Sequence, residues 1–115
     1  MNYYEKILEL KKENKSFVTV TVVQTQGSTP GKTGFKMIVD STKNIWGTVG
    51  GGALENEAVS ESHKMLASKC DNTLKEYLLT NDENIAEPNS SILPMSCSGK
   101  IWLYFNLKNH VLRAW

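Results

Sequence analysis

The sequence predicts an α/β fold, with a small mixed β-sheet covered by one or two helices in a single domain. Short runs of β-branched and apolar residues alternate with turns, and two longer segments repeat apolar residues at helical spacing. At 115 residues the chain can bury roughly two thirds of the surface of its unfolded form around one core. We therefore expect one domain over residues 1–115, with residues 107–115 as a C-terminal tail.

The N-terminal half predicts a helix followed by three strands. Tyr3, Ile7 and Leu10 recur at helical spacing among Glu and Lys, which indicates a short amphipathic helix over residues 2–14. Residues 16–25 are rich in valine and threonine and are typical of a half-buried or central strand. After a glycine-rich loop, two short strands at 35–40 and 44–48 form a hairpin across a polar turn.

The C-terminal half predicts a second helix and two more strands. Leu54, Ala58 and Met65 place an apolar face on a helix over residues 53–69. Strands are expected at 73–79 and 100–107, and a loop at 81–98 that contains two prolines separates them.

Charge and hydropathy exclude several classes of function. Thirteen Lys+Arg against twelve Asp+Glu leave a formal charge of +1, with no basic stripe to bind nucleic acid. No apolar stretch is long enough to span a membrane and no signal region follows the N-terminus, so we expect a cytoplasmic protein. His63, in the polar stretch 60–64, and His110 are expected at the surface and have no metal-site spacing.

The two cysteines lack the paired spacing of a zinc site, so both are expected to be free thiols. Cys70 follows Leu66 and Ala67 at the end of the second helix, where a thiol behaves as a small hydrophobe. Cys97 lies before the last strand and after a long loop, which favours an accessible thiol.

Residues 24–37 look at first like a nucleotide-binding loop, because Gly31-Lys32-Thr33 is how the phosphate-binding G-x-x-x-x-G-K-[ST] motif ends. The first glycine of that motif would fall on Gln26, so the spacing fails. The β-branched residues that follow predict a strand, whereas the motif needs a helix.

Residues 47–55, G-T-V-G-G-G-A-L-E, predict a strand that runs through three glycines into a helix. Adjacent glycines allow a ligand to approach the backbone or allow positive φ, and a helix start offers unpaired N–H groups, so the stretch is a candidate anion site. The alternative is a tight turn that only packs closely. Glu55 in the first turn favours the helix dipole under either interpretation.

Four stretches together resemble one family over roughly residues 5–107. They are Gln26-Gly27-Ser28-Thr29-Pro30, Gly34-x-Lys36-Met37, residues 47–55, and Met95-Ser96-Cys97-Ser98-Gly99-Lys100. Their order and intervals resemble the N-terminal domain of the XdhC and CoxI family. The resemblance implies an accessory factor, a chaperone more than a catalyst, that binds molybdenum cofactor (molybdopterin), assists its sulfuration and delivers it to a hydroxylase such as xanthine or carbon monoxide dehydrogenase. We expect the C-terminal dinucleotide-fold domain that many members carry to be absent.

The resemblance also implies which residues contact the cofactor. The cofactor-binding candidates are Gly27, Ser28, Thr29, Lys32, Gly50, Gly51, Gly52, Glu55, Cys97 and Gly99. The helix start at 50–53 would take the phosphate, helped by Lys32 or Lys36, and Trp46 or Trp102 are weaker candidates to flank the pterin. Cys97 is the candidate for chemistry, as a contact for molybdenum or as an acceptor of persulfide sulfur from a cysteine desulfurase. The alternative for Cys97 is an inert loop thiol.

The expected partners are a molybdenum hydroxylase apoenzyme, a cysteine desulfurase and a second copy of the chain. We expect a homodimer because the strand edges of so small a sheet need covering and the apolar tail at 111–115 is available to cover them. Two alternative functions stay open. One is an interaction module that docks onto a separate maturation factor without binding cofactor. The other is a nucleotide-using transferase with Glu55 or Glu57 as its base.

Overall fold

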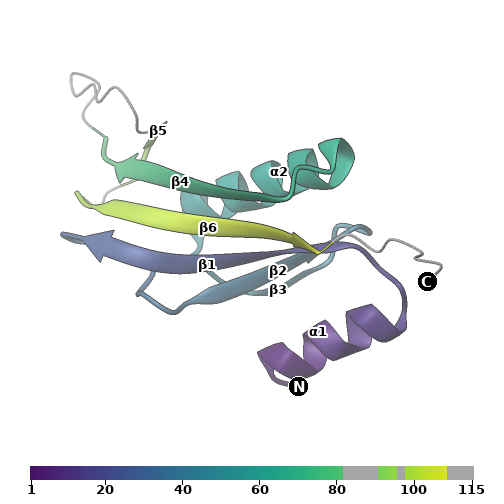
Figure 1. The fold of residues 1–115 in the computed structure, drawn as a ribbon. Helices are drawn as coiled ribbons and strands as arrows, with labels where there is room; N and C mark the ends of the chain where they lie inside the picture. The colour runs from purple at the N-terminus through teal and green to yellow at the C-terminus, as the bar shows by residue number, and fades with distance from the viewer. Residues whose placement is uncertain (82–90, 96–97, 109–115) are drawn as a thin grey trace.

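The computed structural model describes residues 1–81, 91–95 and 98–108, which form one six-stranded mixed sheet with a helix on each face. Along the chain the elements are α1 (Tyr3–Lys12), β1 (Phe17–Gln26), β2 (Lys36–Asp40), β3 (Ile45–Gly47), α2 (Gly52–Ser68), β4 (Asn72–Leu79), β5 (Ser91–Leu93) and β6 (Lys100–Lys108). The strand order is β3-β2-β1-β6-β4-β5. All neighbouring strands are antiparallel except β4 and β5, which are parallel. The α/β fold class predicted from the sequence is therefore confirmed (Figure 1).

The main core lies between α2 and the sheet. Successive side chains of a strand point to opposite faces, so every second residue of β1 and β6 turns toward α2. The core residues of these three elements are Val18, Val20, Val22, Ile101, Leu103, Phe105, Leu54, Ala58 and Met65. The helix and strand patterns thus meet on one face, which fixes α2 across the middle of the sheet.

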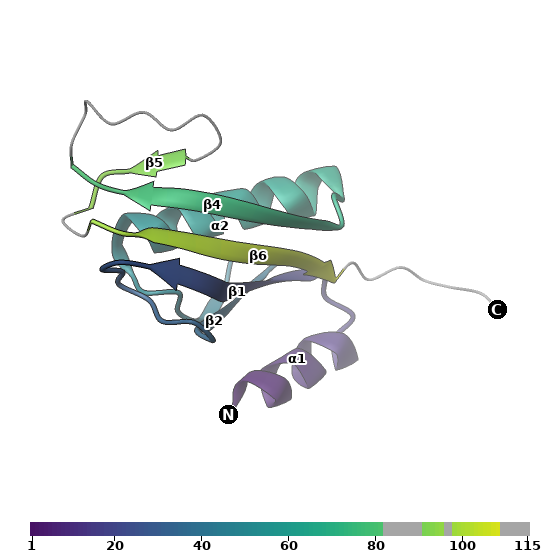
Figure 2. The same cartoon turned by 60° about the vertical axis from the view of Figure 1, so that its left-hand side comes forward.

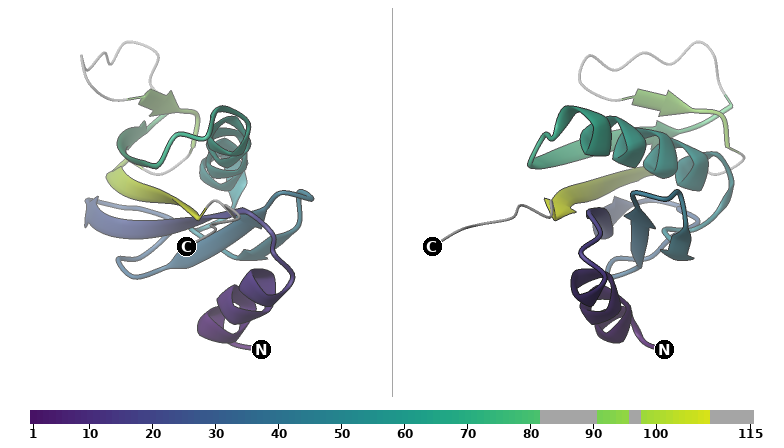
Figure 3. Two further views of the ribbon diagram at one scale, coloured as in Figure 1. Left: turned by 45° about the vertical axis from the view of Figure 1, so that its right-hand side comes forward. Right: turned by 90° about the vertical axis from the view of Figure 1, so that its right-hand side faces the viewer.

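A smaller core lies on the opposite face, under α1. It is built from Leu10, Phe17 and Ile38, with Tyr3, Ile7 and Trp46 packed against it. The Asn2 side chain accepts from the Glu5 N–H at 2.9 Å and the Glu5 carboxylate accepts from the Asn2 N–H at 3.3 Å, a capping box that sets where the helix begins. Its sheet partners all come from β1, β2 and β3, and Figure 3 shows the two helices on opposite sides of the sheet.

The turn of the β2–β3 hairpin is held by Asp40, whose side chain is buried. The carboxylate accepts hydrogen bonds from Thr42 N at 2.9 Å, Thr42 Oγ1 at 2.7 Å and Asn44 N at 3.0 Å. Burial raises the pKa of Asp40, but these hydrogen bonds to its charged form outweigh burial, so the pKa lies below its ordinary value.

The two helices, the hairpin and the long strands predicted from the sequence are all present. The third strand is shorter than predicted and ends at Gly47, and β5 was missed inside the segment expected to be a loop. No described helix is both long and apolar enough to cross a membrane.

Two predictions about single side chains were wrong. Cys70 is exposed and does not pack beside Leu66, because Lys69 ends α2 in the left-handed conformation and turns the chain off the apolar face of the helix. His63 is half-buried, and its Nε2 is buried without a hydrogen-bond partner within the described residues.

Candidate functional site

Three loops that are far apart in the sequence meet at one end of the sheet. The loop after β1 lies against the loop before β6 (Figure 2). A Cβ placed on Gly99 would overlap the backbone oxygen of Ser28 and lie 2.6 Å from that of Gln26. A Cβ on Gly27 would stand 3.3 Å from the backbone oxygen of Ser98. These glycines therefore let two backbones lie against each other.

The loop after β1 also packs against the segment that leads into α2. A Cβ on Gly50 would lie 2.7 Å from the backbone nitrogen of Gly31, and a Cβ on Gly31 would overlap the backbone oxygen of Val49. Only glycine fits at such a backbone crossing. The loop containing residues 27–31 thus lies between the other two loops.

The start of α2 differs from these crossings at Gly51, which faces open space. Gly51, the N-cap residue, has φ +79° and ψ −172°, a conformation that is essentially restricted to glycine, and makes no side-chain capping bond. A Cβ built on Gly51 meets no atom within 4 Å. At Gly52, with φ +60°, a Cβ would meet only the Met95 side chain, at 3.1 Å. Gly51 is therefore open, whereas the Met95 side chain lies against Gly52.

Thr48 and Glu55 brace this helix start. The Thr48 hydroxyl oxygen accepts a hydrogen bond from Gly50 N at 3.0 Å, and the hydroxyl donates to Glu55 Oε1. The carboxylate of the first turn thus holds the segment that leads into the helix. The same bonds satisfy the N–H of Gly50, so the donors directed at a ligand would be those of the residues that follow.

The remaining side chains predicted for the site come from the loop after β1. Ser28 and Lys32 are exposed. Thr29 donates its hydroxyl to the backbone oxygen of Gly31 at 2.8 Å, which stabilises the turn. Cys97 lies outside the described residues.

The other lysine considered for phosphate lies elsewhere. The Lys36 ammonium is 5.9 Å from the centre of the Tyr3 ring, on the α1 face of the sheet. Trp46 packs against the core under α1. Trp102 alternates with the α2-facing residues Ile101 and Leu103, so it too lies on the opposite face.

Three residues of this end of the sheet were not predicted as site residues. Gly31 was considered only as part of a phosphate-binding motif whose spacing fails, although its backbone crosses that of Val49. Thr48 was read as strand, and Met95 as a flank of Cys97. The spacing of Thr48 two residues before a glycine and seven before Glu55 is the signal that could have found the hydroxyl bridge.

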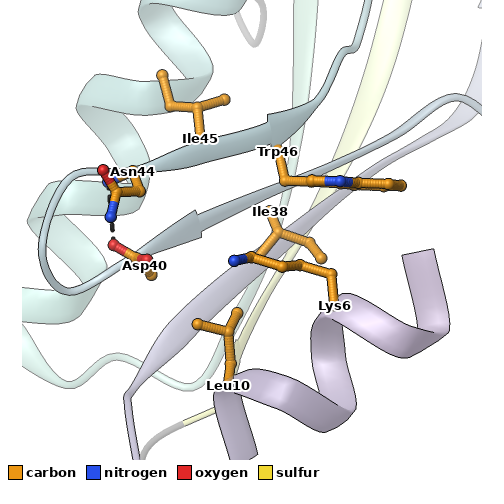
Figure 4. A pocket seen from close by; sticks show the side chains of 7 residues that line it. All are labelled: Lys6, Leu10, Ile38, Asp40, Asn44, Ile45 and Trp46. Carbon is orange, nitrogen blue, oxygen red and sulfur yellow. Dashed lines mark hydrogen bonds between the residues drawn. The ribbon is translucent and has the colours of Figure 1, made fainter. Parts of the chain in front are cut away.

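A hollow of about 120 Å³ lies between α1 and the β2–β3 hairpin, away from the glycine loops. It is lined by Lys6, Leu10, Ile38, Asp40, Asn44, Ile45 and Trp46 (Figure 4). The Asp40 carboxylate is committed to the hairpin turn, and the Lys6 ammonium pairs with Glu9 Oε1 at 2.9 Å. The charged groups of this hollow therefore stabilise the fold, which makes the hollow a weaker candidate for a ligand site than the glycine loops.

The carboxylates required by the transferase alternative are also engaged. Glu55 accepts from Thr48, and Glu57 Oε2 accepts from the Tyr77 hydroxyl at 3.1 Å. Among residues 1–81, 91–95 and 98–108, no group of three His, Cys, Asp or Glu side chains could hold a metal ion. The loop at 26–34 is followed by a strand, β2, as predicted, and so lacks the helix that a nucleotide-binding loop requires.

Fold and loops together define a small α/β domain in which a glycine-lined helix start is braced by two neighbouring loops. The chain belongs to the XdhC and CoxI family, whose sequence profile matches residues 10–77, more than half of its length. It is 32% identical over 69 residues to the uncharacterised protein YqeB of Escherichia coli K12, a match that covers 60% of this chain and 13% of YqeB.

The fold is also that of a solved structure, described as a xanthine dehydrogenase, BH1974 of Bacillus halodurans. The TM-score is 0.69 at 20% identity, and the match covers 93% of this chain and 30% of the other. The chain thus spans less than a third of the length of either relative.

Proposed function

We propose that this chain binds molybdenum cofactor at the glycine-lined start of α2 and acts as an accessory factor in the maturation of a molybdenum hydroxylase. The observation that carries the proposal is that the family-typical stretches 26–30 and 47–55, together with residues 95, 98 and 99 of the fourth stretch, lie against one another at one end of the sheet. Membership of the XdhC and CoxI family supports the link to hydroxylase maturation, as does the description of the structural relative as a xanthine dehydrogenase.

The residues at the helix start fit the phosphate group of the cofactor. Gly51 has no side chain to occupy the open space before the helix, and a helix start directs backbone N–H groups and a partial positive charge toward an anion. Lys32, exposed on the neighbouring loop, adds a cation, and the exposed Ser28 adds a hydroxyl. The cofactor, a phosphorylated pterin that holds molybdenum through a dithiolene, supplies the hydroxylase with its metal centre.

The finer step that we propose is sulfuration through Cys97. The Cys97 thiolate would attack the outer sulfur of a persulfide on a cysteine desulfurase, forming a new S–S bond while the desulfurase cysteine leaves as a thiolate. Cys97 would then carry the sulfur for the cofactor. Gly99, two residues after Cys97 in the sequence, packs against the backbone of Ser28 beside the proposed phosphate site.

The test is the cofactor content of purified protein. The wild type and two variants, Gly51→Val and Gly34→Val, would be produced in a host that makes molybdenum cofactor, then denatured and oxidised to release a fluorescent pterin. Gly34 is the matched control because it has φ +97° and open space around a Cβ, like Gly51, but does not belong to the start of α2.

We expect the wild type and Gly34→Val to release pterin and Gly51→Val to release little, with all three folded by circular dichroism. A wild type without pterin would refute cofactor binding and favour the interaction module. Equal pterin in all three would refute the placement at the helix start.

A further inference from the structure

The hollow between α1 and the β2–β3 hairpin combines an apolar wall with two opposite charges. Leu10 and Ile38 are buried and Trp46 is half-buried, and these three side chains form the wall. The charges are those of Lys6, whose ammonium is directed toward the Asp40 side of the hollow, and of Asp40 itself (Figure 4). A hollow with polar groups in its lining holds water or a ligand, whereas a purely apolar cavity stays dry.

Asp40 stabilises the hairpin turn with only one of its two carboxylate oxygens. The residue is 2% exposed, and the hydrogen bonds from Thr42 and Asn44 all end on Oδ1. Within the described residues, Oδ2 therefore accepts no hydrogen bond, although an ionised carboxylate can accept at both oxygens. Since the pKa of Asp40 lies below its ordinary value, the group is negatively charged at neutral pH. A buried carboxylate oxygen without a partner costs free energy, which a donor placed in the hollow would recover.

Lys6 also has donors to spare. An ammonium has three N–H donors, and the described ion pair with Glu9 Oε1, at 2.9 Å, uses one of them. This hydrogen bond is the main cause that raises the pKa of Lys6, and the negative charge of Asp40 raises it further. Among the described ion pairs, Lys6 is joined to Glu9 and not to Asp40. The hollow therefore has a positive and a negative group that are close but not paired with each other.

The size of the hollow limits what it can hold. Its volume is about 120 Å³, and an apolar cavity of about 150 Å³ holds one benzene molecule. By that comparison the hollow has room for a molecule of about five or six non-hydrogen atoms. A molecule of this size with opposite charges at its two ends and a short apolar group matches the lining.

We propose that this hollow binds a small zwitterion of the amino-acid class. The ammonium of the ligand donates to Asp40 Oδ2, its carboxylate accepts from Lys6 Nζ, and its short side chain packs against Trp46. This site is separate from the glycine loops and goes beyond the function proposed for them. Because Lys6 belongs to α1 and Asp40 ends β2, the bound ligand joins the helix to the hairpin.

The proposal is tested by NMR titration of isotope-labelled protein at pH 7 with three small molecules. L-Alanine has both charges, ethylammonium lacks the carboxylate, and propionate lacks the ammonium. This series tests the contribution of Asp40 without replacing it, since a replacement would disturb the hairpin turn. The signal followed is the indole N–H of Trp46, identified by its loss in Trp46→Phe. Trp102, which does not line the hollow, is the internal reference.

The variant that tests the other charge is Lys6→Gln. Its matched control is Lys11→Gln, because Lys11 is an exposed lysine in the last turn of the same helix and does not line the hollow. Circular dichroism checks that both variants are folded.

We expect L-alanine to shift the Trp46 signal of the wild type and of Lys11→Gln with a Kd of about 1 mM. Lys6→Gln should bind L-alanine at least roughly tenfold more weakly, as the wild type should bind ethylammonium and propionate, because each lacks one charge-assisted hydrogen bond. An unchanged Trp46 signal at about 20 mM L-alanine would show that the hollow holds only water and would overturn the proposal. Equal binding of L-alanine by the two lysine variants would also overturn it, as would ethylammonium or propionate that binds as tightly as L-alanine.

Discussion

The hydroxyl of Tyr77 donates a hydrogen bond to Glu57 Oε2 across 3.1 Å and so joins β4 to the second turn of α2. The Tyr77 side chain is fully buried. Burial raises the pKa of Tyr77 well above its ordinary value, and the negative charge and hydrogen bond of Glu57 raise it further, so the phenol stays protonated as a donor. The bond therefore fixes how α2, with its glycine-lined start, lies on the sheet.

Replacing Tyr77 by phenylalanine should lower the free energy of unfolding by about 1 to 2 kcal/mol, because the Glu57 carboxylate loses a partner without any loss of apolar volume. Urea unfolding at neutral pH measures the change. Tyr4→Phe is the control, since Tyr4 is 72% exposed. Equal midpoints for Tyr77→Phe and Tyr4→Phe would contradict the prediction.

Asp40 should make stability depend on pH. Its pKa is lowered from 3.8 in the folded state, so its contribution to stability is present above that pH and is lost as pH falls through the folded value. Asp40→Asn should therefore cost about 1 to 2 kcal/mol at pH 7, with the difference from the wild type shrinking toward pH 3. Denaturant unfolding at the two pH values decides. A difference that does not change with pH would show that the charge of Asp40 is irrelevant.

The glycines at the loop crossing should differ in their effect on folding. Gly31→Ala should destabilise the fold by about 1 to 3 kcal/mol because its Cβ would overlap the backbone oxygen of Val49, which cannot move freely. Gly51→Ala should cost about 1 kcal/mol, from positive φ alone. Thermal unfolding of both variants measures the order. A less stable Gly51→Ala would contradict it.

Cys97→Ser should keep the fold and the pterin content but reduce activation of an apo-hydroxylase supplied with a sulfur source. A serine hydroxyl cannot carry persulfide sulfur. Cys70→Ser is the control, because Cys70 is an exposed free thiol at the other end of α2 and should change neither property. Equal activation by the wild type and Cys97→Ser at equal cofactor loading would leave the protein as a passive carrier.

The periodic spacing of apolar residues predicted the main helices and strands because the burial of one apolar face determines each of them. Val18, Val20 and Val22 alternate as residues do when one face of a strand is buried, and Leu54, Ala58 and Met65 recur as on a helix packed against that face. By contrast, β5 has three residues and forms by pairing with the edge of β4. No local sequence pattern predicts such a pairing between distant segments. Cys70 was misplaced because the left-handed turn at Lys69 depends on the backbone and not on hydropathy.

The candidate site could be proposed from the sequence as a set of motifs but not as a surface. The sequence identified the glycines, yet it could not separate those that allow backbones to cross, such as Gly31 and Gly99, from Gly51, which leaves the helix start open. That distinction depends on which loops lie against each other in space. The side of the sheet on which Lys36 lies likewise followed only from the register of β2 with β1.

The backbone crossings limit which substitutions this domain can accept during evolution. Where Gly99 lies against Ser28 and Gln26, and Gly50 against Gly31, the neighbouring group is a main-chain atom, which no substitution in the facing loop can shrink. A side chain gained at one of these positions therefore cannot be compensated by a smaller one opposite, unlike an exchange of volumes within the core. Insertions or deletions that move a whole loop are the remaining route of divergence. Family members in which these glycines are replaced should therefore have loops of different length at this end of the sheet.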